Sequence, residues 1–166
     1  MRQRLLKAEE VIFRGEFGTA IFLMVAVIAV ASGQVFGRYV LDYAPAWFEE
    51  LARYLFVWVV FIGAPIGIRE RGHMAIMVVV DHLPPAWRKI CSLLIYAVAG
   101  VFLLILTWQG ISIMIHTGSQ VSPTMEISMT WVYAAVPVGS ILMLFHLAIS
   151  FLKMGFSGNP LFSFEG

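Results

Sequence analysis

Four long runs without a charged residue dominate this chain of 166 residues. Three of them, Phe17–Gly37, Ile90–Ile115 and Ile127–Leu152, contain 21 to 26 residues each. A helix needs about 20 residues to cross a hydrocarbon core about 30 Å thick. The composition agrees, because 60% of the residues are hydrophobic and only 13% are charged, whereas soluble domains have about 25% charged residues. The sequence therefore predicts an all-α integral membrane protein with four transmembrane helices.

The second run, Tyr54–Ile68, has only 15 residues. If its helix crosses the membrane, Glu49, Glu50 and Arg53 are drawn to one edge of the membrane, and Arg69 marks the opposite edge together with Arg71. A charged residue at the centre of a membrane helix costs about 2.5–3.5 kcal/mol. We expect this cost to be avoided because the residues lie near the surface, pair with each other or face another protein.

The predicted layout has one membrane domain over residues 17–154. Its helices are expected at residues 17–38, 45–68, 85–116 and 128–153. Short interfacial segments are expected at 1–16 and 74–82, and a loose tail at 155–166. The lead-in at 1–16 is amphipathic, and it forms either a short helix on the membrane surface or a solvated extension. Pro137 cannot donate a backbone hydrogen bond, so we expect a kink near Ala134–Pro137.

The distribution of basic residues predicts the orientation, because cytoplasmic loops carry an excess of Lys and Arg. One side of the predicted topology has nine: Arg2, Arg4, Lys7, Arg14, Arg69, Arg71, Arg88, Lys89 and Lys153. The other side has only Arg38 and Arg53. Both termini are therefore expected in the cytoplasm.

The sequence offers little for catalysis or ligand chemistry. A single cysteine, Cys91, excludes an internal disulfide and a cysteine-based metal cage. A net charge of +1 gives no reason to expect a nucleic-acid partner. His116 and His146 raise the possibility of a haem, but they are expected at different depths in the membrane. For His146 we favour a hydrogen-bonded packing role, and no cofactor is expected in this chain.

A transport pathway within this chain is also unexpected. Secondary transporters usually contain internal repeats, broken helices and polar sites near the membrane midplane. Here only Pro137 is expected to break a helix, and no charged residue is expected at the midplane. Four helices are too few to enclose a route for a sizeable solute. The small residues of the helices favour close packing, either within the chain or with a partner: Gly63, Ala64, Gly67, Ala97, Gly100, Gly110 and Gly139.

The sharpest polar signal lies at the outer ends of the first two helices. Arg38 ends the first helix at the level where Glu49, Glu50 and Arg53 begin the second. We hypothesise a network of these two bases and two acids that locks the hairpin or meets a partner. The alternative is four separately hydrated interfacial charges. The candidate structural or partner-contact residues are Arg38, Trp47, Glu49, Glu50, Arg53, Trp58, Arg69, Arg71 and His73.

Several segments of the chain carry a resemblance to a known family. They read FGRYV at 36–40, WFEELARYLFVWVVFIGA at 47–64, IRERGH at 68–73, LP at 83–84 and TWVYAAVPVGSILM at 130–143. In this order and spacing the chain resembles the small membrane subunit, the DctQ-like Q component, of tripartite ATP-independent periplasmic (TRAP) transporters. One position departs from the pattern, since Met77 stands where the family often has an acidic residue. This departure argues against a polar role for the segment 74–80.

The resemblance implies a function that composition does not reveal. Such subunits pair with a large TRAP permease subunit in the bacterial inner membrane, which carries the substrate and sodium sites. A periplasmic substrate-binding protein delivers an organic acid such as a C4-dicarboxylate or sialic acid. The small subunit would then be a non-catalytic scaffold whose remaining surface meets membrane lipid. Two alternatives stay open: a cytochrome b-like redox subunit with a haem on His116 and His146, and a stand-alone membrane assembly factor.

Overall fold

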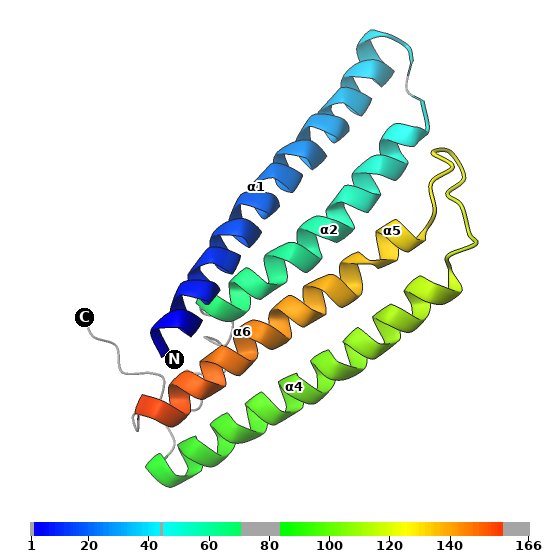
Figure 1. The fold of residues 1–166 in the computed structure, drawn as a ribbon. Helices are drawn as coiled ribbons and strands as arrows, with labels where there is room; N and C mark the ends of the chain where they lie inside the picture. Colours follow the sequence, from blue (N-terminus) through cyan, green and yellow to red (C-terminus); the bar gives the residue numbers. More distant parts are fainter. Residues whose placement is uncertain (1, 44, 71–83, 158–166) are drawn as a thin grey trace.

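The computed structural model of the protein describes residues 2–43, 45–70 and 84–157. Its helices are α1 (Arg2–Val40), α2 (Trp47–Glu70), α4 (Pro85–His116), α5 (Thr130–Tyr133) and α6 (Ala135–Ser157). Four spans, with α5 and α6 together forming one of them, are long and apolar enough to cross a membrane. The predicted all-α membrane fold with four spanning helices is therefore confirmed (Figure 1).

The helices lie side by side in a single layer rather than around a closed core. α1 packs on α2, α2 packs on α6, and α6 packs on α4 (Figure 1). The α5/α6 span is the most enclosed, because 44% of its most apolar window is buried, whereas the figure for α1 is 6%. The beginning of α1 and the end of α6 lie at the same end of the layer (Figure 1). α1 and α4 therefore form the two edges, and most of their surface has no neighbour within the described residues.

Residues 2–16 do not form a separate lead-in, which differs from the predicted layout. They are the beginning of α1, whose 39 residues extend about 58 Å at 1.5 Å per residue. The reason is that three acids of this segment, Glu9, Glu10 and Glu16, have partners on other helices, as described below, so the helix stays packed on the layer. The predicted interfacial segment at 74–82 lies outside the described residues. α6 continues to Ser157, and the rest of the expected tail also lies outside them.

The expected interruption of the last span is confirmed. Regular helix stops at Tyr133 and resumes at Ala135. Two residues later, Pro137 lacks the N–H that would bond to the Tyr133 carbonyl. The indole Nε1–H of Trp58 donates a hydrogen bond to the Trp131 carbonyl, at 3.2 Å. A side chain of α2 thus supports the backbone of α5 next to this interruption.

Two glycines allow the central helices to approach closely. A Cβ atom at Gly139 of α6 would lie 2.7 Å from Phe61 Cβ and would also clash with the Phe61 carbonyl. A Cβ atom at Gly110 of α4 would lie 2.9 Å from Val136 Cγ1. Gly63, by contrast, faces open space. Of the small residues noted in the sequence, Gly110 and Gly139 are therefore the ones at which the contact between helices depends on the missing side chain.

The contact between α4 and α6 combines apolar packing with one hydroxyl pair. Leu103, Met143 and Leu147 form a buried cluster between the two helices. Beside it, Thr107 Oγ1 donates to Ser140 Oγ at 2.8 Å, and Ser140 is completely buried. Hydrogen bonds of this kind are a usual means of joining helices in a membrane, where apolar side chains gain little by leaving lipid.

Candidate functional site at the two ends of the helix layer

At the end of the layer where α2 begins, named the outer end after the predicted orientation, Glu50 anchors the connection between α4 and α5. Its side chain is 7% exposed. Its Oε2 accepts hydrogen bonds from the backbone N–H groups of Thr124 and Met125, at 3.0 and 3.2 Å, and from the Thr124 hydroxyl. Its Oε1 accepts a hydrogen bond from the Tyr54 hydroxyl. One carboxylate therefore joins the beginning of α2 to a loop that lies 74 residues away in the sequence.

The anchored loop, residues 117–129, is folded on itself. Val121 and Ser128 form an antiparallel bridge, and the Ser122 N–H donates to the Ile127 carbonyl at 2.9 Å. Glu126 lies in the turn of this loop with a positive φ of 54°. The loop thus has internal hydrogen bonds and an external anchor, and Glu50 fixes its position over the start of α2.

The four-residue charge network expected at this end does not form. Arg53 Nη2 pairs with Glu49 Oε1 at 3.1 Å, and both side chains are about two-thirds exposed. Arg38 has no hydrogen bond or ion pair with any residue that the structure describes. Glu50 bonds to the loop and not to Arg38 or Arg53, since backbone N–H groups that need an acceptor lie directly above it. Only the Glu49–Arg53 part of the network is present.

The two aromatic candidates have different environments. Trp47 is exposed at the start of α2, where its ring stacks on Phe48 with centroids 4.0 Å apart. This position suits the membrane interface, where amphipathic rings concentrate. Trp58 is half-buried and bonds to the α5 backbone as described above. Trp58 is therefore a tie within the chain, whereas Trp47 remains available at the surface.

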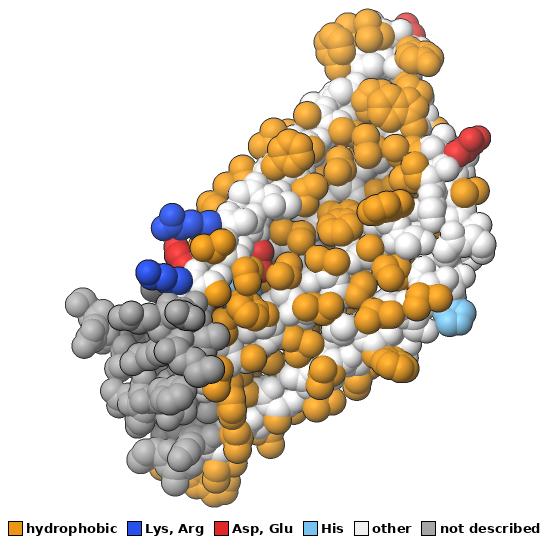
Figure 2. Space-filling model, viewed as in Figure 1, with side chains coloured by type: hydrophobic (Ala, Val, Ile, Leu, Met, Phe, Trp, Pro, Cys, Tyr) orange, Lys and Arg blue, Asp and Glu red, His pale blue; other side chains and the backbone are white. Residues whose placement is uncertain are grey.

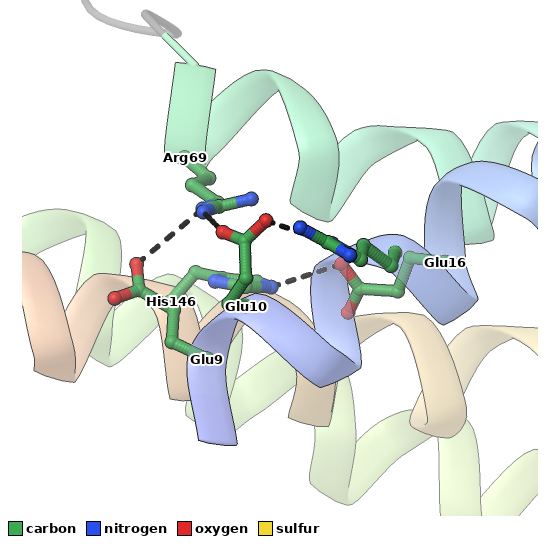
Figure 3. A network of polar contacts seen from close by, with 6 residues as sticks. Glu9, Glu10, Glu16, Arg69 and His146 are labelled. Atoms are coloured by element: carbon green, nitrogen blue, oxygen red, sulfur yellow. Dashed lines mark hydrogen bonds and ion pairs between the residues drawn. The ribbon is translucent and has the colours of Figure 1, made fainter. Parts of the chain in front are cut away.

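At the opposite end, named the inner end after the predicted orientation, Arg69 joins the end of α2 to the beginning of α1 (Figure 3). Its guanidinium lies 2.5 Å from Glu10 Oε2, 3.6 Å from Glu9 Oε1 and 3.6 Å from the centre of the Phe13 ring. Glu10 also pairs with Arg14 at 3.0 Å. These contacts explain why residues 2–16 belong to α1. The other two candidates of this region, Arg71 and His73, lie outside the described residues.

Next to this network lies a buried pair between α1 and α6 (Figure 3). His146 Nε2 is 2.9 Å from Glu16 Oε2, and the two side chains are 0% and 4% exposed. The two atoms share one hydrogen bond across the contact between α1 and α6. Glu16 Oε1 and His146 Nδ1 have no hydrogen-bond partner among the described residues. The expected packing role of His146 is confirmed, and its partner Glu16 was missed.

A signal for Glu16 was present in the sequence. Glu9 and Glu16 are seven residues apart, and this spacing places both on one face of a helix. Both are buried, and Phe13 between them contacts Arg69. Two acids and an aromatic residue on one helical face indicate contact with another polar helix rather than with lipid. The prediction of a separate segment at residues 1–16 missed this signal because it treated residue 16 as the end of a surface segment.

The positions of His116 and His146 along their helices decide whether the two side chains can hold one haem. His116 is exposed at the end of α4, where its Nδ1 is 2.7 Å from the Ser112 carbonyl. Gly110 lies beside Pro137, so His116 is about 9 Å from that level in one direction and His146 about 13 Å in the other. No group of three metal-binding side chains occurs in the described part of the chain. The two histidines are thus too far apart to hold one haem.

The two ends are separated by one membrane thickness. Glu50 and Arg69 are 19 residues apart on α2, a rise of about 28 Å, close to the roughly 30 Å of a hydrocarbon core. Glu10 is level with Arg69, and Glu16 is six residues further along α1, so the Glu16–His146 pair lies on the membrane side of this charge network. The geometry therefore describes a membrane layer with an anchored loop at one edge and a charge network at the other.

Comparison with known proteins places this layer in a family. The family model "Tripartite ATP-independent periplasmic transporters, DctQ component" matches residues 27–154. A C4-dicarboxylate TRAP transporter small permease protein of Rhodobacter capsulatus is 35% identical over 114 residues, which cover 66% of this chain and 50% of the relative. A sialic acid TRAP transporter small permease protein of Vibrio cholerae is 31% identical over 126 residues, covering 74% of this chain and 71% of the relative.

In a longer relative, the match covers a much smaller share of the relative's own length. A sialic acid TRAP transporter permease protein of Haemophilus influenzae is 28% identical over 123 residues, which cover 74% of this chain but 20% of the relative. The chain thus spans about half the length of the C4-dicarboxylate relative and about a fifth of this longer permease protein. In the longer protein, the segment similar to this chain is covalently continuous with a much larger polypeptide.

Proposed function

Because the chain belongs to the DctQ family of TRAP transporters, a family of transport components and not of enzymes, we propose that it is the non-catalytic scaffold of a TRAP permease. Its relatives are small permease proteins, and its four apolar spans make it a multi-pass protein of the inner membrane. In this role the chain binds a large permease subunit and supports it in the membrane.

The observation that carries this proposal is the open, single-layer arrangement of the helices. A layer in which α1 and α4 form separate edges does not surround a pathway for a solute. Hydrophobic side chains are distributed along the whole length of the helices on the viewed face, whereas charged ones appear only near its ends (Figure 2). The polar contacts lie mainly at its two ends, where they fix the helices against one another. Such a layer suits a fixed support for another membrane protein, which must supply the pathway.

The substrate and its coupling belong to the partner subunits in this proposal. The relatives are named for C4-dicarboxylate, sialic acid and isethionate, all of which are organic anions. We propose that the system takes up an organic acid delivered by a periplasmic substrate-binding protein and coupled to sodium in the large subunit. The small subunit needs no cofactor of its own. The excess of basic residues on one side favours cytoplasmic termini.

Co-purification tests the proposed pairing. The chain carries an affinity tag and is expressed with the large TRAP permease encoded beside it. We expect the permease, identified by mass spectrometry, to elute with the tagged chain in a constant ratio through size-exclusion chromatography. A four-helix membrane protein without a TRAP permease partner serves as the tagged control. Elution of this chain alone, at an expression level equal to that of the permease, would contradict the proposal.

A further inference from the structure

The contacts between helices give the depth of each residue in the layer. Phe61 of α2 is eleven residues from Glu50 and eight from Arg69, so it lies near the middle of the span. Gly139 of α6 packs against Phe61, and Gly110 of α4 packs against Pro137, two residues from Gly139. α4 residues next to Gly110 therefore lie within a few ångströms of the membrane midplane.

Gln109 lies at this depth, and its side chain faces away from the other helices of the layer. Its side chain is exposed, and it has no hydrogen-bond partner among the residues that the structure describes. An amide has two donor hydrogens and one acceptor oxygen. Hydrocarbon cannot satisfy them, and from the midplane the side chain cannot reach either membrane edge. A serine or threonine hydroxyl in a helix can bond to the carbonyl four residues earlier, but the Gln109 amide makes no such bond to the described part of its helix.

The same face of α4 carries a shallow apolar groove. It has a volume of about 410 Å³ and is lined by Ala97, Val98, Val101, Phe102 and Ile105. Ile105 and Gln109 are four residues apart, and side chains at this spacing are neighbours on a helix. The small side chain of Ala97 leaves room between larger neighbours. The face therefore offers an apolar groove on which another helix can pack, with the polar side chain of Gln109 one turn away.

We propose that this outer face of α4 binds a transmembrane helix of the large permease subunit, which presents a hydrogen-bonding group to Gln109. The inference rests on the proposed function and specifies its contact surface. It is supported by the relatives of Haemophilus influenzae and Oleidesulfovibrio alaskensis, in which the matched segment forms 20% and 19% of one longer permease protein. The partner of this segment is thus a large membrane protein, whose helices can supply a polar group at midplane depth.

The opposite edge lacks this feature. At the same depth, α1 exposes Gly18, Thr19, Ile21 and Phe22, none of which is an amide or a charged residue. The outer face of α1 can therefore lie against lipid without an unsatisfied amide, whereas the face of α4 cannot. This contrast selects α4 over α1 as the docking edge.

Photocrosslinking distinguishes the two edges. A photoreactive amino acid replaces Ile105 on α4 or, as the matched control, Phe22 on α1, and each variant is expressed with the neighbouring large permease. We expect an adduct with the permease from position 105 and none from position 22. A permease adduct from position 22 only would overturn the inference, as would an adduct from position 105 that contains only lipid or a second copy of this chain.

Substitution of the amide provides a second measurement. Gln109→Leu is expected to lower the amount of co-purified permease roughly three- to thirtyfold, the range given by hydrogen bonds between membrane helices. Gln34→Leu, the same change near the outer end of α1, is the control and is expected to have no effect. If Gln109→Leu binds the permease as well as the unaltered chain does, the inference is wrong while the proposed function stands. If the unaltered chain does not bind the permease, both are wrong.

Discussion

Replacing His146 with leucine is expected to lower the free energy of unfolding by about 3–5 kcal/mol. The substitution leaves the Glu16 carboxylate buried between α1 and α6 without the partner that now lies 2.9 Å away. Removing one member of a buried pair is costly because the remaining polar group has neither water nor a hydrogen-bond partner. The change is measured by following the loss of helix and tertiary contacts during denaturant titration in mixed micelles.

A double-mutant cycle separates this pair from general packing effects. In the variant that carries both Glu16→Leu and His146→Leu, neither polar group of the pair remains buried, so we expect it to be more stable than either single variant. His116→Leu serves as the control, because His116 is exposed, and it is expected to change stability by within about 0.5 kcal/mol. Purely additive losses in the cycle would contradict the pairing of Glu16 with His146.

Replacing Glu50 with leucine is expected to release the loop 117–129 from the outer end of α2. The loop would lose the acceptor for two backbone N–H groups and one hydroxyl. Hydrogen bonds to charged groups are strong enough that we expect amide hydrogen exchange of Thr124 and Met125 to accelerate roughly ten- to a hundredfold. Mass spectrometry of peptides from this loop measures the exchange.

Two variants of the neighbouring exposed pair provide the controls. Glu49→Leu and Arg53→Leu break an ion pair between side chains that are both about two-thirds exposed, and such pairs contribute little. We expect exchange in the loop to remain within about twofold of the unaltered protein in both. If Glu49→Leu accelerated exchange as much as Glu50→Leu, the anchor would not be Glu50.

The elements that were predicted correctly depend on local sequence. The four spans follow from uncharged runs of sufficient length, and the break before α6 follows from the missing N–H of Pro137. His146 was correctly interpreted as a hydrogen-bonded packing residue because a lone histidine in an apolar helix needs a partner. In each case the physical cause lies within one segment of the chain.

The elements that were missed depend on contacts between distant segments. The role of Glu50 depends on N–H groups 74 and 75 residues away, and that of Glu16 on a side chain 130 residues away. Hydrophobic runs give the number and length of helices but not which helices are neighbours. For the same reason the sequence suggested a charge network including Arg38, although the loop supplies better partners for Glu50. The single-layer order of the helices likewise became apparent only from the structure.

Uptake by reconstituted proteoliposomes tests the scaffold role most directly. The large permease and the periplasmic binding protein are reconstituted with and without this chain, with equal amounts of permease in both preparations, and uptake of a radiolabelled organic acid is measured across a sodium gradient. The account predicts sodium-dependent uptake only when the chain is present, and no uptake by the chain alone. Equal uptake in its absence would contradict the scaffold role.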